Sequence, residues 1–257
     1  MHKAEGLLDR QTRLLEYLTS REAIFGDVGS TSRNPLLQGF DRALLHIEAR
    51  FSHEKRMEKI AAVFPKTFAL LGDDRDAIVR EFVHACPPFD ISRLENARQL
   101  YNFLISRWEN RPPALRYLPD VATCELAIAQ VRIGADSRLA VAKRPAHKRP
   151  THKRPTHNRP THNRPSEIRR NPLIALLHTR FDVRPIFEGK WGDFSPIERV
   201  VPLAISFRAG EIGIFELTPE VFNLLAALDA WVAVDELPNA EGLIADLGEA
   251  GLLEERR

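Results

Sequence analysis

Apolar residues recur at spacings of three and four along residues 7–134, which is the pattern of amphipathic helices. The clearest stripe is formed by Leu36, Phe40, Leu44, Ile47 and Phe51. Helix starts are marked by Asn34-Pro35, by Asp73-Asp74 and by a capping box at Ser92 and Glu95. A break is expected near Ser52. Residues 7–134 are therefore predicted to form a bundle of about five helices, the last ending near Gly134.

The hydrophobic period changes in the second half of the chain. Asn171-Pro172 predicts a short helix over the stretch LIALLHTR, and residues 182–187 are predicted to be extended. Residues 200–208 and 211–217 have the pattern of two strands, with a hairpin turn at Arg208-Ala209-Gly210. Thr218-Pro219-Glu220 marks a helix start. Further short helices are predicted over residues 234–237 and 240–250, with Gly251 as the C-cap.

This order of elements predicts an α+β fold. It consists of an N-terminal helical bundle and a small C-terminal winged-helix-like domain with a two- to three-stranded antiparallel sheet. The predicted domains are the bundle over residues 1–136, a basic linker over residues 137–168, and a small leader-peptide-recognition-like domain over residues 169–257.

The linker contains the run KRPAHKRPTHKRPTHNRPTHNRP (Lys143–Pro165), in which a five-residue unit repeats. Proline in every unit is typical of an extended, disordered linker. The four histidines recur every five residues, so neither a helix face nor a strand face gathers them into a metal site. The repeat is interpreted as a tolerated insert, and a metal-storing role is the weaker hypothesis.

The positive charge of the chain comes from this repeat. The 257 residues include 37 Lys and Arg against 35 Asp and Glu, a formal net charge of +2. The repeat holds eight of the basic residues and no acid, which leaves 29 basic and 35 acidic residues elsewhere, a net of −6. A basic composition often accompanies nucleic-acid binding. Because the excess is confined to one low-complexity segment, nucleic acid is not expected as a partner.

No sequence motif indicates an independent catalytic site. Gly-rich phosphate loops, GxSxG and HExxH are missing from the sequence. Cys86 and Cys124 lie in apolar helical patterns, where a thiol acts as a small hydrophobe. No apolar run approaches the roughly 20 residues that span a bilayer, and two cysteines make no disulfide framework. A cytoplasmic protein without a cofactor or membrane partner of its own is expected.

Three stretches resemble a bacterial family often labelled DNA-binding, which includes HvfC- and TglI-type proteins. They are FPKTFALLGDDRDAIVREFVHACPP (Phe64–Pro88), YNFL (Tyr101–Leu104) and RYLPDVATCELAIAQ (Arg116–Gln130). Members accompany TIM-barrel enzymes with multinuclear iron centres, which oxidise cysteines on ribosomally made peptides. The stretch RFSHEKRMEKIAAVFP (Arg50–Pro65) replaces the family's usual Arg-Asn-Asn-like run. It is more similar to MbnC-type partner subunits of methanobactin biosynthesis, while a TglI-type or other sister subgroup stays open.

The second half is similar in layout to leader-peptide recognition domains, in which the leader adds to a small sheet as an extra strand. The resemblance implies a non-catalytic subunit that binds a cysteine-containing precursor peptide and docks on an MbnB-type TIM-barrel iron enzyme. The iron belongs to that enzyme, which would convert peptide cysteines to oxazolone–thioamide groups with dioxygen, as in the biosynthesis of a copper chelator.

Two groups of site residues follow as hypotheses. The expected peptide-binding residues are Phe207, Ile212, Ile214 and Phe215, and the free edge is the backbone of residues 211–217 or of residues 200–207. The expected docking residues are Arg50, Lys55, Arg56 and Lys59, on one helix face, and Trp191, in the loop FEGKWGDFSP. The alternatives are core packing for the first group, a solvated face for the basic residues and local packing for Trp191.

A DNA-binding regulator is the alternative function, because the layout resembles a winged helix. A recognition helix would carry Arg, Lys, Asn or Gln toward the bases. The candidate segments VAVDELP and AEGLIADLGEA carry acids and no base, which counts against this alternative.

Overall fold

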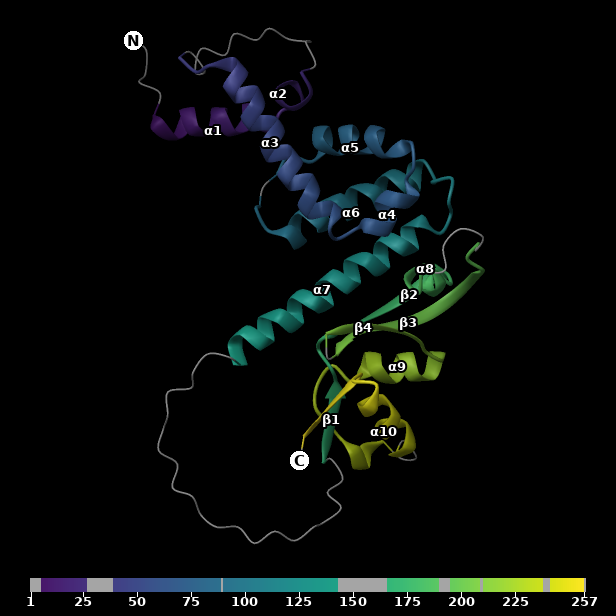
Figure 1. Ribbon diagram of the computed structural model, residues 1–257. Helices are drawn as coiled ribbons and strands as arrows, with labels where there is room; N and C mark the ends of the chain where they lie inside the picture. Colours follow the sequence, from purple (N-terminus) through teal and green to yellow (C-terminus); the bar gives the residue numbers. More distant parts are fainter. Residues whose placement is uncertain are drawn as a thin grey trace, which may run out of the picture. The chain divides into compact units, whose positions relative to one another are not determined.

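The computed structural model describes residues 6–26, 39–88, 90–142, 166–189, 195–208, 210–237 and 241–256 (Figure 1). The chain divides into two compact units, Met1–Leu126 and Ala127–Arg257. The boundary falls within helix α7 (Leu118–Ala142). This helix continues past Gly134, where the prediction ended it, and includes residues 137–142 of the expected linker. The repeat itself lies outside the described residues.

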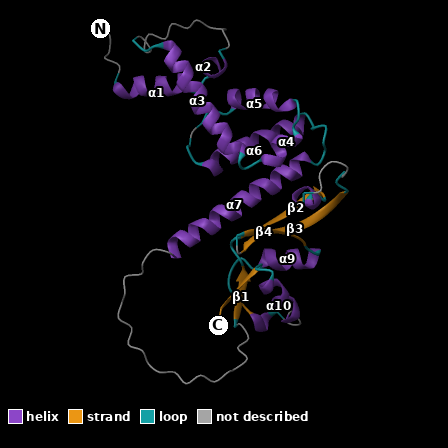
Figure 2. Ribbon diagram, in the orientation of Figure 1, coloured by secondary structure: helices purple, strands orange, loops and turns teal. Residues whose placement is uncertain are grey.

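The described part of the first unit is helical (Figure 2). Its elements are α1 (Leu7–Leu18), α2 (Arg21–Phe25), α3 (Arg42–Ala61), α4 (Pro65–Leu70), α5 (Asp74–Ala85), α6 (Arg93–Asn110) and the beginning of α7. Half of the capping box predicted for α6 is confirmed, since the Ser92 hydroxyl accepts a hydrogen bond from the Glu95 N–H at 3.4 Å. The Ser92 N–H donates to Asp90 Oδ1 at 2.7 Å instead of to Glu95. The predicted start at Asn34-Pro35 lies outside the described residues. In the structure, Asp41 caps α3, and the helix runs through Ser52 without the expected break.

The first unit packs around Ile60, Phe64, Phe82, Leu100 and Leu104, all of which are fully buried. The apolar stripe predicted for α3 is wrong. Leu44, Ile47 and Phe51 are 63%, 63% and 55% exposed, whereas Leu45, Ala49 and Ile60 face the interior. The buried positions of α3 are therefore offset by about one residue in the sequence from the positions predicted to be buried.

The described residues of the second unit form two antiparallel three-stranded sheets, in the orders β5-β1-β6 and β2-β3-β4. The strands are β1 (Glu167–Arg170), β2 (Ile174–Phe181), β3 (Glu198–Arg208), β4 (Glu211–Glu216), β5 (Val232–Ala233) and β6 (Leu253–Arg256). The helices after α7 are α8 (Arg184–Phe187), α9 (Pro219–Ala227), the 3-10 helix η2 (Val234–Glu236) and α10 (Glu241–Glu249). The α+β fold class, with helices first and a small antiparallel three-stranded sheet later, is confirmed.

Two local predictions for this unit are wrong. The stretch LIALLHTR is not a helix but most of strand β2. The Asn171 carboxamide accepts a hydrogen bond from the Leu173 N–H at 2.9 Å and donates to the Gly251 carbonyl at 2.9 Å, so it shapes a turn between β1 and β2. Residues 182–187, which were expected to be extended, include the short helix α8.

The hairpin and the later helices agree with prediction. Strands β3 and β4 pair from Arg208 and Glu211 at the turn. Thr218 caps α9 by accepting a hydrogen bond from the Val221 N–H at 3.4 Å. Gly251 has a φ of +73°, the left-handed conformation that glycine adopts after a helix end.

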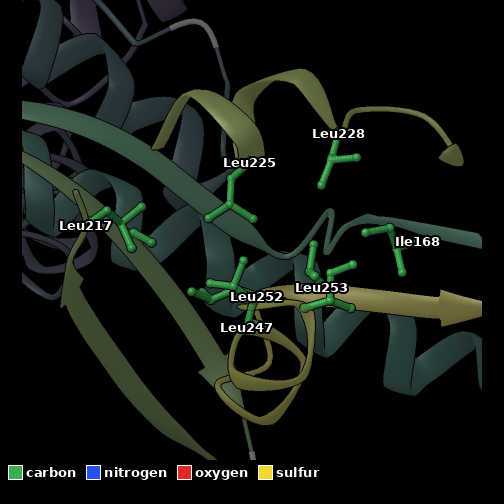
Figure 3. Close-up of a cluster of buried hydrophobic side chains, with 9 residues drawn as sticks. Ile168, Leu217, Leu225, Leu228, Leu247, Leu252 and Leu253 are labelled. Carbon is green, nitrogen blue, oxygen red and sulfur yellow. The ribbon is translucent and has the colours of Figure 1, made fainter. Parts of the chain in front are cut away.

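One hydrophobic cluster holds the strands and helices of the second unit together (Figure 3). Leu225 and Leu228 from the α9 region converge with Ile168 of β1 and with Leu247, Leu252 and Leu253 from the C-terminal segment. Ala204 of β3 and Leu217, just after β4, belong to the same cluster. The cluster thus covers one face of the β2-β3-β4 sheet. Candidate binding sites are therefore sought at the ends and edges of this sheet.

Candidate peptide-binding edge

Strand β4 is an edge strand of the β2-β3-β4 sheet. The central strand, β3, is paired with β2 on one side and with β4 on the other. The prediction that the backbone of residues 200–207 offers a free edge is therefore wrong. Among the described residues, β4 pairs with β3 alone, so its far side presents unpaired backbone groups.

The strand register identifies these unpaired groups. The β3–β4 hairpin has a two-residue loop between Arg208 and Glu211. In such a hairpin the residue pair next to the loop, Arg208 and Glu211, exchanges backbone hydrogen bonds, and so does every second residue pair beyond it. The Leu217 N–H donates to the Pro202 carbonyl at 2.9 Å, which continues the same alternation. It follows that the N–H and C=O groups of Ile212, Ile214 and Glu216 point away from β3.

The two edges of this sheet differ in regularity. The pairing of β2 with β3 shifts between Thr179 and Phe181, and Arg180 lies at this irregularity. Irregular pairing and charge are features that protect a sheet edge from adding another strand. The pairing of β4 with β3 has no shift, and β4 contains neither proline nor lysine. Strand β4 is therefore the better template for strand addition.

The four residues predicted to bind peptide are all half-buried, but they do not form a single patch. Phe207 and Ile212 are cross-strand partners, and Ile214 lies two residues further along β4, so these three share one face. Phe215 lies on the opposite face, where it packs against the hydrophobic cluster. Its ring lies over Gly213, and a β-carbon on that glycine would be 2.6 Å from the Phe215 Cε2 atom.

A ring of four charges closes one end of the β4 edge, and sequence reasoning missed it. Asp182 accepts from Arg184 at 2.7 Å and from Arg199 at 2.8 Å. Glu216 accepts from Arg199 at 2.6 Å and also pairs with Arg184. The pKa of Asp182 is lowered to about 2. The largest cause is the side-chain hydrogen bonding from Arg184, and the positive charge of Arg184 and the hydrogen bond from Arg199 add to it. Asp182 and Arg184 lie only two residues apart, but Arg199 and Glu216 come from β3 and β4, so no single local motif signals the arrangement.

The other end of β4 carries a different charge pattern. Glu211 is exposed, and the described residues give it no ion pair. Its cross-strand neighbour, Arg208, donates to the Glu249 carbonyl at the end of α10 and is thereby directed to that helix. Among the described residues, the β4 edge thus runs from a carboxylate without an ion pair at Glu211 to one paired with two arginines at Glu216.

The predicted docking residues Arg50 and Lys55 are exposed, but both are accompanied by acids. Arg50 lies 3.9 Å from Glu54, and Lys55 lies 3.1 Å from Glu58. Lys59 donates to the Ile91 carbonyl at 3.3 Å. The face is therefore of mixed charge. Trp191, the remaining predicted docking residue, lies outside the described residues.

Arg56 does not belong to an exposed face. Its side chain is buried, and its guanidinium donates to Asn96 Oδ1 at 2.8 Å, to the Cys86 carbonyl at 2.9 Å and to Gln99 Oε1 at 2.6 Å. The guanidinium carbon lies 4.6 Å from the centroid of the Phe82 ring. Burial is the main reason why the pKa of Arg56 falls to about 10. Arg56 thus holds the loop between α5 and α6 in place.

The same loop is held by other side chains. Gln99 donates to the Pro87 carbonyl at 3.0 Å, and the Asn96 amide donates to the carbonyls of Asp90 and Ser92 at 2.8 Å each. Both donors lie on α6, which follows the loop directly, whereas Arg56 reaches the loop from α3. Sequence reasoning missed this arrangement because single polar residues within a helical pattern do not reveal their partners.

Neither cysteine has the surroundings of a reactive thiol. Cys124 is fully buried, and burial together with the nearby carboxylates of Asp120 and Glu125 raises its pKa to about 12. Cys86 is half-buried, and burial raises its pKa although Arg56 acts in the opposite direction. Across the described residues, no group of three or more His, Cys, Asp and Glu side chains is placed to hold a metal ion. The four repeat histidines lie outside that part of the chain.

Comparison of the chain with protein-family models and with curated proteins found no match. Within the ranges that the structure describes, no helix combines the length and the apolar character needed to cross a membrane.

Proposed function

We propose that the protein is a non-catalytic, peptide-binding partner subunit of a TIM-barrel iron enzyme that modifies peptides. The observation that carries this proposal is the regular edge of β4, which pairs with no second strand among the described residues and has Ile212 and Ile214 on one face and Phe215 on the other. An edge of this kind binds an extended peptide by adding it as a strand, with backbone hydrogen bonds giving affinity and side chains giving selectivity.

The resemblance of Phe64–Pro88 and Arg116–Gln130 to HvfC-, TglI- and MbnC-type proteins supplies the partner and the reaction. The bound peptide is a precursor whose cysteines the partner enzyme converts to oxazolone–thioamide groups, with iron held by that enzyme. The role of this chain is to hold the leader segment, so that the cysteines reach the iron centre of the partner. A cytoplasmic location fits this role.

Docking on the enzyme is assigned to both units. The first unit offers the mixed-charge face of Arg50, Lys55 and Lys59, beside the exposed side chain of Phe51. Lysine and arginine at the rim of an interface change the association rate and its salt dependence more than they change affinity. Salt-sensitive association is therefore expected.

The test is co-expression of the full chain with an MbnB-type TIM-barrel iron enzyme, followed by gel filtration and titration with the Cys-containing precursor peptide of that enzyme. A stable heterodimer that binds the precursor is expected. Separate elution of the two proteins, with no peptide binding by their mixture, would overturn the proposal.

A pair of variants locates the binding edge. Ile214→Pro removes an N–H that points away from β3 and leaves the β3 ladder intact, so it should weaken precursor binding about tenfold. His178→Pro makes the equivalent change on the β2 edge and should leave the affinity within twofold. Circular dichroism and thermal melting establish that both variants fold. An equal loss of affinity in the two variants would contradict the assignment to β4.

A further inference from the structure

We infer that β4 selects an extended segment in which a short apolar run is followed, toward the C-terminus of the peptide, by a basic residue. This inference rests on the proposed function, because it concerns the same edge. It adds the chemistry and the direction of the strand that the edge accepts. Three observations lead to it: the strand register, the apolar residues on both faces of β4, and the unequal charges at its two ends.

The register fixes which positions of the peptide form hydrogen bonds. The outward groups of β4 belong to Ile212, Ile214 and Glu216, so peptide residues opposite these three exchange backbone hydrogen bonds with the strand. Peptide residues opposite Gly213 and Phe215 form the non-hydrogen-bonded pairs, whose side chains lie closer together. An antiparallel peptide continues the antiparallel order of the sheet and gives the slightly more stable pairing.

The side chains of β4 favour an apolar peptide segment on both faces. Opposite Ile214 and Ile212, a β-branched or aliphatic peptide residue forms an apolar cross-strand pair. On the other face, the Phe215 ring extends over Gly213, so a peptide side chain at either of those positions meets the aromatic ring. A polar residue at these central positions would lose its contact with water and find no hydrogen-bond partner on the strand.

The ends of β4 give the peptide its direction. At Glu216 the carboxylate is already bound by Arg184 and Arg199, so it attracts a further cation weakly. At Glu211 the carboxylate is exposed and the described residues give it no ion pair, so a lysine or arginine opposite it gains a cross-strand charge pair. An antiparallel peptide passes Glu216 first and Glu211 last. The basic residue therefore follows the apolar run.

The experiment compares two acetylated, fluorescein-labelled peptides of identical composition, with full-length protein and fluorescence anisotropy as the readout. In one, an alternating valine–isoleucine run precedes a single lysine, and in the other the order of the residues is reversed. The first peptide should bind about threefold more tightly than the second. Equal affinities, or tighter binding of the reversed peptide, would overturn the inference about direction.

A charge exchange tests the role of Glu211 directly. Glu211→Lys should weaken binding of the lysine-ending peptide about threefold, and a peptide that ends in glutamate should regain that affinity with the variant. Asp229→Lys is the matched control, since it makes the same charge change at another exposed acid of the second unit and should leave both affinities unchanged. The same loss in both variants would assign the effect to net charge and overturn the local pairing.

Failure of this inference is distinguishable from failure of the proposed function. If the precursor binds the heterodimer while the two probe peptides bind alike, the chain remains a peptide-binding subunit and the selectivity assigned to β4 is wrong. If neither the precursor nor a probe binds, both proposals are overturned.

Discussion

The ring of Phe215 lies over Gly213, two residues earlier on the same edge strand, so closely that a β-carbon on Gly213 would be 2.6 Å from Cε2 and 2.7 Å from Cζ of the ring. The Phe215 ring covers the face of β4 at Gly213, where the glycine has no side chain of its own to cover the backbone. This packing of an aromatic ring over a glycine supports the regular geometry of an edge strand.

The contact predicts the effect of adding one methyl group. Gly213→Ala should displace the Phe215 ring and lower the free energy of unfolding by about 1–2 kcal/mol. The control is Gly242→Ala in α10, where a β-carbon meets no atom within 4 Å and alanine favours the helix by about 0.5–1 kcal/mol. Urea denaturation of both variants measures the difference, and a neutral Gly213→Ala substitution would contradict the packing.

The charge ring predicts a specific response to acid. The pKa of Asp182 is lowered from its ordinary 3.8 to about 2 in the folded protein, so its contribution to stability is complete above about pH 4 and is lost as the pH falls toward 2. The pKa of Glu216 is also lowered, mainly by its hydrogen bond with Arg199, and this contribution fades over the same acidic range. Asp182→Asn should therefore flatten the pH dependence of stability between pH 4 and pH 2.

Melting temperatures of the wild type and of Asp182→Asn, measured at intervals through that range, test this point. Asp229→Asn, at an exposed acid outside the ring, serves as the control and should retain the slope of the wild type. An unchanged slope in Asp182→Asn would show that the ion pairs do not contribute to folding stability.

The buried guanidinium of Arg56 predicts that lysine cannot replace it. Lysine keeps the charge but loses the planar set of donors that reaches Asn96, Gln99 and the Cys86 carbonyl together. Arg56→Lys should therefore cost at least about 2 kcal/mol of stability and speed amide exchange in the loop between α5 and α6. Arg50→Met, at an exposed neighbour, should change stability by less than about 0.5 kcal/mol. Equal effects of the two substitutions would refute the role of Arg56.

The two thiols should differ in reactivity. Cys124 is fully buried with its pKa raised to about 12, so a thiol reagent at pH 8 should modify it only after unfolding. Cys86 is half-buried and should be modified slowly in the native protein. Peptide mapping after brief labelling, with and without urea, distinguishes the two. Labelling of Cys124 in the native state would contradict the packing of α7 in the first unit.

The sequence predicted features whose signals are local. The cap at Ser92, the start of α9 at Thr218 and the β3–β4 hairpin all rest on residues adjacent in the chain, and all three are confirmed. Strand β2 was missed because its apolar run has no clear period, and an asparagine before proline looks like a helix cap. Strands β1 and β6 are short and charged, and only their long-range pairing makes them strands.

The candidate site shows the same division. Ile212 and Ile214 were predicted from the hairpin pattern, because alternation is visible within a strand. The buried position of Arg56 was not predicted, because a lone arginine in a helix is ordinarily solvated. Its hydrogen-bond partners lie 30 to 43 residues away in the sequence. Which edge is free is equally beyond local sequence, because it depends on the order of strands from distant segments.

The most direct test of strand addition at β4 is residue-resolved amide hydrogen exchange, with the full-length protein free and saturated with the lysine-ending probe peptide. The N–H groups of Ile212, Ile214 and Glu216 should become protected, while those of Gly213 and Phe215, already bonded to β3, should change little. New protection in β2, or none in β4, would contradict the assignment of β4 as the peptide-binding edge.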